Sequence, residues 1–172
     1  MTARLLTLAA FAGCIVAANA ATASLGVVAW FGVAATAGTW LAGLSFVARD
    51  WMHETGGPKW VALALIVGAA LSALMSPTLA LASVVAFTLS ETADWAVYAP
   101  LRRRGKVRAA LASNVVGSVV DSAAFLLLAG FPLALLGTQV LVKVAASTAV
   151  VIGVRLAVLR QPVLAAGGGR HA

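Results

Sequence analysis

Four ionisable side chains lie inside long apolar stretches of this chain: Glu91, Asp94, Asp121 and Lys143. A charge at the centre of a bilayer costs roughly 2.5–3.5 kcal/mol or more, so such residues tend to mark a binding site or a transport pathway. Because three carboxylates face one lysine, at least one acid must be protonated, reach Arg49 or Arg102, or await a partner from outside. A ligand rich in hydrogen-bond donors would complete the set.

Helical spacing places these residues on polar stripes. Three such stripes occur on consecutive apolar stretches: Glu91, Asp94, Trp95 and Tyr98; Asn114, Ser118, Asp121 and Phe125; and Gln139, Lys143 and Ser147. Because lipid cannot satisfy polar groups, the stripes must face each other or water, which predicts a polar cavity with aromatic walls. The alternative is that they only hold the bundle together through buried hydrogen bonds, which average less than about 1 kcal/mol each.

The composition predicts an integral membrane protein. Of the 172 residues, 62% are hydrophobic and 10% are charged, and no charge occurs from Leu5 to Ala48 or from Val61 to Ser90. This excludes soluble enzymes, and at about 20 residues per span the length allows roughly five to seven membrane helices and no second, aqueous domain. The net charge of +7 does not indicate nucleic acid, because the basic residues lie at the ends of apolar stretches.

Breaker residues divide the chain into an all-α fold of six spans. We expect helices near 4–21, 26–48, 60–76, 78–100, 108–130 and 134–155, with turns at 19–24, 56–58, 76–77, 104–105 and 130–132. Residues 1–164 then form one transmembrane domain, and residues 165–172 form a disordered tail. The second span is interrupted at Gly38-Thr39, where it either breaks or continues as a tilted helix.

Charge asymmetry predicts the orientation of the spans. Basic residues lie in four places: before the first span (Arg4), in the second connection (Arg49 and Lys59), in the fourth connection (Arg102, Arg103, Arg104, Lys106 and Arg108) and after the last span (Arg155, Arg160 and Arg170). The other connections carry none, so both termini are expected in the cytoplasm of a multi-pass inner-membrane protein. The first apolar stretch, up to Ala23, also fits a cleavable signal peptide, which would leave the same orientation.

No catalytic motif accompanies these residues. The chain has no Gly-rich phosphate loop ending in Lys-Ser or Lys-Thr. His53 lies between Asp50 and Glu54, a pattern better explained by a capped loop than by a metal site, and the single cysteine excludes a disulfide framework. An intramembrane hydrolase using Asp94 and Asp121 has two acids but no supporting motif. We therefore expect no enzyme, no metal and no cofactor.

Three strings resemble those of a known family. Phe46 to Asp50, continuing to Glu54 and Gly57, resembles an "F…D…E…G" signature. ETADWAVYAPLR (91–102) and SNVVGSVVDSAAF (113–125) look like the motifs "E..D..vY..lr" and "SN..g...Ds..F" of the VUT family of YhhQ-type queuosine precursor transporters. Ala18-Asn19 and Lys143 also match family positions, so the first span is expected to remain uncleaved. The resemblance covers about residues 18 to 145.

The resemblance implies a six-helix fold related to the substrate-binding components of energy-coupling-factor transporters. It also implies import of a 7-deazaguanine such as 7-cyano-7-deazaguanine. A carboxylate can accept hydrogen bonds from the adjacent N–H groups of such a base, and aromatic side chains can stack on its ring. The residues expected to bind substrate are Glu91, Asp94, Trp95, Tyr98, Asn114, Asp121, Phe125, Lys143, Phe46 and Asp50. An alternative function is capture of another vitamin for an energy-coupling ATPase complex.

Overall fold

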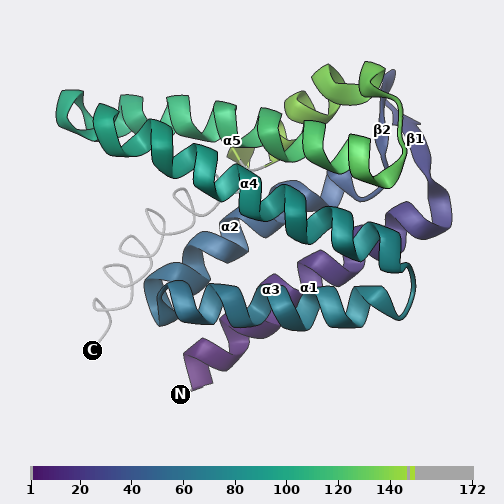
Figure 1. Ribbon diagram of the computed structural model, residues 1–172, viewed down its shortest axis with the longest axis horizontal. Coiled ribbons are helices and arrows are strands. Elements are labelled where there is room, and N and C mark those ends of the chain that lie inside the picture. Colours follow the sequence, from purple (N-terminus) through teal and green to yellow (C-terminus); the bar gives the residue numbers. More distant parts are fainter. Residues whose placement is uncertain (1, 147, 150–172) are drawn as a thin grey trace, which may run out of the picture.

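The computed structural model describes residues 2–146, 148 and 149, without the side chains of residues 50, 106, 107, 110 and 111. This part of the chain is mostly helical (Figure 1). Its elements are α1 (Thr2–Leu25), β1 (Val27–Trp30), β2 (Val33–Thr36), α2 (Thr39–Gly56), α3 (Pro58–Ala73), α4 (Pro77–Leu101), the 3-10 turn η1 (Arg102–Arg104), α5 (Lys106–Ala129) and the 3-10 turn η2 (Leu133–Leu135). We call the apolar stretch Leu133–Ala146, which begins with η2, the C-terminal helical segment.

Four of the predicted turns are confirmed, and local side chains explain them. Pro58 begins α3, a position where its missing N–H leaves no hydrogen bond unmade. Ser76 caps α4 by accepting a hydrogen bond from the Leu79 N–H at 3.3 Å. Gly130 ends α5 in the left-handed region at φ +75°, which a residue without Cβ adopts at little cost. The turns at 56–58, 76–77, 104–105 and 130–132 therefore follow from their own sequence.

Two expectations about the first third of the chain are wrong. Residues 19–24, expected as a turn, continue α1, and residues 26–38, expected as the start of the second helix, contain an antiparallel hairpin with Val27 opposite Thr36. The two-residue turn at the hairpin tip has positive φ at Phe31 (53°) and Gly32 (77°), the conformation that suits tight hairpins. The break at Gly38-Thr39 is the correct alternative, since α2 begins at Thr39.

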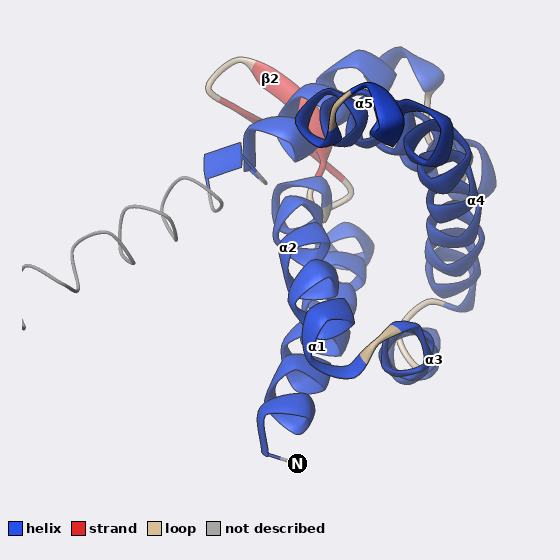
Figure 2. Ribbon diagram, turned by 90° about the vertical axis from the view of Figure 1, so that its left-hand side faces the viewer, coloured by secondary structure: helices blue, strands red, loops and turns tan. Residues whose placement is uncertain are grey.

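The helices form two halves that lie side by side (Figures 1 and 2). In the first, α1 packs against both α2 and α3; in the second, α4 and α5 pack along each other. The halves meet where α3 contacts α4. Gly38 allows α1 and α2 to approach closely, because a Cβ there would lie 2.1 Å from the Ala18 carbonyl oxygen.

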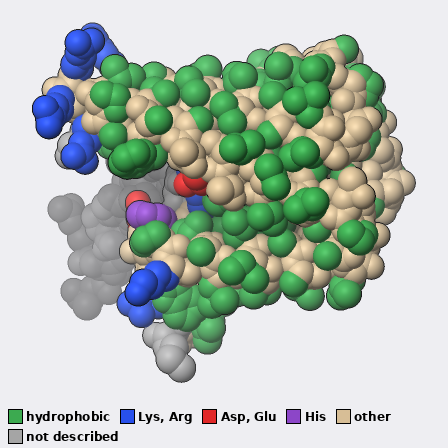
Figure 3. All heavy atoms as spheres, in the orientation of Figure 1, with side chains coloured by type: hydrophobic (Ala, Val, Ile, Leu, Met, Phe, Trp, Pro, Cys, Tyr) green, Lys and Arg blue, Asp and Glu red, His purple; other side chains and the backbone are tan. Residues whose placement is uncertain are grey.

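Charge is distributed unevenly along the helices. Figure 3 shows most of the visible Lys and Arg side chains at one end of the molecule, where η1 and the α2–α3 turn lie, whereas the opposite end carries the hairpin and the uncharged turns.

Among the described helices, α1 and residues Ala112–Ala129 are long and apolar enough to cross a membrane, and Pro58–Ala73 and Leu133–Ala146 are shorter apolar helices. Six spans and their orientation remain predictions.

Several expectations concern the end of the chain. The described residues include the beginning of the expected sixth span, as far as Ala149. Outside the described residues lie Ser147, the span's end at 150–155, the basic residues Arg155, Arg160 and Arg170, and the tail 165–172.

Candidate functional site

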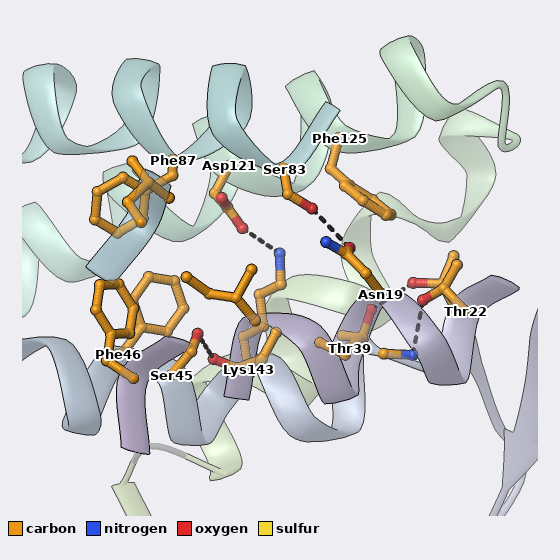
Figure 4. Close-up of a pocket in the computed structure, with 17 residues that line it drawn as sticks. Asn19, Thr22, Thr39, Ser45, Phe46, Ser83, Phe87, Asp121, Phe125 and Lys143 are labelled. Carbon is orange, nitrogen blue, oxygen red and sulfur yellow. Dashed lines mark hydrogen bonds and ion pairs between the residues drawn. The ribbon is translucent and has the colours of Figure 1, made fainter. Parts of the chain in front are cut away.

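A cavity lies between the two halves of the molecule (Figure 4). Its empty volume is about 630 Å³, counting the part that opens outward. All five long helices, the hairpin and the C-terminal helical segment contribute to its lining. The lining residues are Phe11, Ile15, Ala18, Asn19, Thr22, Thr36, Gly38, Thr39, Ala42, Ser45, Phe46, Leu65, Ser83, Phe87, Asp121, Phe125 and Lys143.

One wall of the cavity carries a buried ion pair. Lys143, only 3% exposed, pairs with the Asp121 Oδ2, and its Nζ also donates to the Ser122 Oγ at 3.0 Å. The turn at 130–132 explains the register, because Asp121 and Lys143 lie about equally far from it along antiparallel helices of about 1.5 Å rise per residue. Counting residues from this turn in the sequence predicts that Lys143 pairs with Asp121, and the structure confirms that prediction.

Asn19 faces the cavity from α1. Its side chain is 4% exposed, and its Oδ1 accepts a hydrogen bond from the Ser83 hydroxyl of α4 at 2.8 Å. Its Nδ2 has no hydrogen-bond partner among the described residues. Asn19 therefore joins α1 to α4 through its oxygen and presents an unused donor.

Hydroxyl groups hold the hairpin at one end of the cavity. The Gly38 N–H donates to the Thr22 Oγ1 at 3.0 Å, and the hydroxyls of Thr36 and Thr39 lie 2.7 Å apart. The Gln139 Nε2 donates to the Thr36 Oγ1 at 3.1 Å from the C-terminal helical segment. These bonds satisfy polar groups at the end of the hairpin and so fix it against the helices.

Aromatic side chains form the apolar part of the lining. Phe46 and Phe125, both predicted from the sequence, lie there together with Phe11 and Phe87. The rings of Phe11 and Phe87 have centroids 5.8 Å apart at an interplanar angle of 46°. A flat ring can therefore contact aromatic carbon beside the buried ion pair.

A second ion pair connects the two halves outside the cavity. Arg49 of α2 pairs with Glu91 of α4, and their side chains are 13% and 38% exposed. The Arg49 guanidinium also lies 5.8 Å from the centroid of the Phe46 ring, within the range of a cation–π contact. Glu91 thus has one of the partners that the sequence allowed, but neither Arg49 nor Glu91 lines the cavity.

The remaining predicted site residues do not gather in the cavity. Asp94 is half-buried against α5, where a Cβ at Gly117 would lie 3.7 Å from its Oδ1, and it has no ion pair within the described ranges. Trp95 is 71% exposed, Asn114 is exposed and Tyr98 is half-buried, all outside the cavity. The side chain of Asp50 lies outside the described residues.

Sequence reasoning missed several polar lining residues. Asn19 and Thr22 are spaced i and i+3 on one face of an apolar stretch, a signal hidden by the incorrect turn at 19–24. Ser83 and Phe87 extend the Glu91 stripe of α4 by two turns at i−8 and i−4. Extending the Glu91 stripe toward the uncharged end of α4 would have found Ser83 and Phe87.

The described residues include no group of three or more His, Cys, Asp or Glu side chains that could hold a metal ion. A family model described as a putative vitamin uptake transporter matches residues 72–165. The matched part contains α4, α5, Asp121 and Lys143. No curated protein and no solved structure matches the chain.

Proposed function

Because the chain belongs to the family of putative vitamin uptake transporters, we propose that it imports a queuosine precursor, a 7-deazaguanine such as 7-cyano-7-deazaguanine. Family membership makes the chain a membrane protein for small-molecule uptake. The proposed substrate is bound in the cavity between the two halves. We also propose that both termini lie in the cytoplasm, because the basic connections gather at one end.

The observation that carries this proposal is the Asp121–Lys143 pair in an otherwise largely apolar cavity. The pair balances its own charge, so the cavity favours a neutral ligand over an ion, which would remain unpaired there. The Asp121 carboxylate keeps lone pairs that can accept N–H groups from a guanine-like edge. The rings of Phe46, Phe87 and Phe125 supply apolar surface for the heterocycle.

Among the ten residues expected from the sequence, the proposed substrate contacts are therefore the four that line the cavity: Asp121, Lys143, Phe125 and Phe46. We assign Glu91 to the ion pair that joins α2 and α4. The pair joins the two halves, and neither of its side chains lines the cavity, so we expect its loss to affect the placement of the halves more than ligand affinity.

A genetic rescue tests the function. The host is a bacterium that can neither make queuosine precursors nor import them, supplied with 7-cyano-7-deazaguanine at nanomolar concentration. Expression of this chain should restore queuosine in tRNA, whereas Asp121→Ala at equal membrane abundance should not. Failure of the wild-type protein, shown to be in the membrane, would overturn the proposed substrate.

The same assay separates a self-sufficient transporter from a substrate-capture subunit. We expect rescue to persist in a host that lacks every energy-coupling ATPase. Loss of rescue in that host alone would assign the chain to substrate capture for such a complex.

A further inference from the structure

The amide of Asn19 is an unused hydrogen-bond donor inside the cavity. Buried polar groups in proteins are nearly always paired, so an unpaired one requires an explanation. Three other buried side-chain atoms also lack partners among the described residues: Trp40 Nε1, Ser72 Oγ and Gln139 Oε1. None of those three residues lines the cavity, whereas Asn19 does. The unused Asn19 donor therefore points to a molecule that occupies the cavity.

The hydrogen bonds around Asn19 use its amide oxygen and leave its amide nitrogen without a partner among the described residues. The Ser83 hydroxyl donates to Oδ1, which leaves Nδ2 as the free end. The Thr22 hydroxyl, one turn further along the same face of α1, already accepts the Gly38 N–H. Asn19 lies within a continuous helix, so its side chain does not cap a helix end. Figure 4 shows it directed into the space that the Asp121–Lys143 pair enters from another wall.

We propose that Asn19 is a specificity-determining residue that donates a hydrogen bond from Nδ2 to a carbonyl oxygen of the ligand. Asp121, on the facing wall, offers an acceptor. A ring carrying a carbonyl directly beside an N–H satisfies both residues at once, so the ligand class is a neutral heterocycle with such a lactam edge. This assignment rests on the proposed function. Asn19 lies outside the segment 72–165 that the family model matches.

If the role of Asn19 is purely structural, its substitution should change the affinities for different ligands in a different way. If Asn19 served only to join α1 to α4, its loss would act through Ser83, and any change in affinity would be the same for all ligands. A role in recognition instead depends on the acceptor strength of the ligand. The decisive comparison therefore varies the ligand and the residue together.

The experiment uses the purified full chain in lipid nanodiscs and calorimetric binding of two ligands. One is 7-cyano-7-deazaguanine, and the other is its analogue with sulfur in place of the ring carbonyl oxygen, which keeps the N–H and weakens the acceptor. Asn19→Leu removes the donor. If the leucine variant does not accumulate in the membrane, Asn19→Ala is used in its place. Ser83→Ala removes the tether, and Thr88→Val is the matched control, because Thr88 is exposed on α4 and bonds to its own helix.

The wild-type protein and Thr88→Val should prefer the oxo ligand to the thio ligand. The Asn19 variant should bind the oxo ligand at least about tenfold more weakly, as expected for a lost hydrogen bond to a desolvated group, and should lose the preference. Ser83→Ala should keep the preference. An Asn19 variant that keeps the wild-type preference would overturn the role of Asn19 alone. Failure of the wild-type protein to bind either ligand would overturn the proposed substrate and this assignment with it.

Discussion

Lys143 and Asp121 form an ion pair across the turn that joins α5 to the C-terminal helical segment. The lysine side chain is 4% exposed and the aspartate 16%, so both charges are largely removed from water. In such surroundings a charge without a partner is far more costly than in water. The pair therefore sets the polarity of the cavity and fixes two of its helices relative to one another.

Removal of one partner should be worse than removal of both. Lys143→Met leaves the Asp121 carboxylate unpaired and should lower the free energy of unfolding by about 3–5 kcal/mol, whereas Lys143→Met with Asp121→Asn should recover more than half of that loss. Thermal and denaturant unfolding of the purified variants give the four corners of the cycle. Strictly additive effects would show that the two residues do not interact.

The Arg49–Glu91 pair should affect the coupling of the two halves more than ligand binding. Arg49→Glu and Glu91→Arg should each reduce uptake, and the double exchange should restore part of it, because the pair re-forms with opposite polarity. Ligand affinity should change by less than about threefold, since neither side chain lines the cavity. A tenfold loss of affinity in Glu91→Gln would instead favour the ligand contact predicted from the α4 stripe.

Gly38 should be intolerant of the smallest side chain. In Gly38→Ala the new Cβ would lie 2.1 Å from the Ala18 carbonyl oxygen, so α1 and α2 must separate at about 1–3 kcal/mol or more. Gly13→Ala is the matched control: nothing lies within 4 Å of a Cβ there, and alanine favours α1 by roughly 0.5–1 kcal/mol. The unfolding temperature should fall in Gly38→Ala and rise in Gly13→Ala. Equal unfolding temperatures would contradict the close packing at Gly38.

The orientation of the helices can be read with reporters. A reporter active only outside the cell should work when fused after Gly32, Ser76 or Phe131, at the uncharged end of the molecule, and fail after Gly56 or Gly105. Fluorescent fusions, which require the cytoplasm, should give the reverse pattern. Two discordant positions would overturn the six-span topology.

Much of this protein is encoded locally. The apolar stretches indicate membrane helices because uncharged runs of that length have no other stable environment. The turns at 56–58, 76–77, 104–105 and 130–132 follow from Gly, Pro and Ser acting on their own backbone. The Asp121–Lys143 register could be counted from the intervening turn, since two adjacent antiparallel helices leave few alternatives.

Other features depended on segments far apart in the chain. The sequence predicts residues 27–36 as part of a helix, but they pair as a hairpin. Thr138 and Gln139 of the C-terminal helical segment contact this hairpin. The Arg49–Glu91 pair requires α2 to lie beside α4, which no local pattern specifies. Long-range contacts of this kind depend on helix tilt and separation, and these are set by the packing of all the helices together.

The difference between what the sequence predicts and what tertiary packing decides is greatest at the cavity. The sequence by itself showed which polar residues lie within apolar stretches, but each step along a helix turns the side chain by about 100°, so small rotations decide which polar residue faces inward. Tertiary packing brought Asn19, Ser83 and Asp121 to one cavity and left Trp95 and Asn114 outside it. Residue type and spacing are local properties, whereas the rotation of each helix against its neighbours is settled only when the whole bundle is packed.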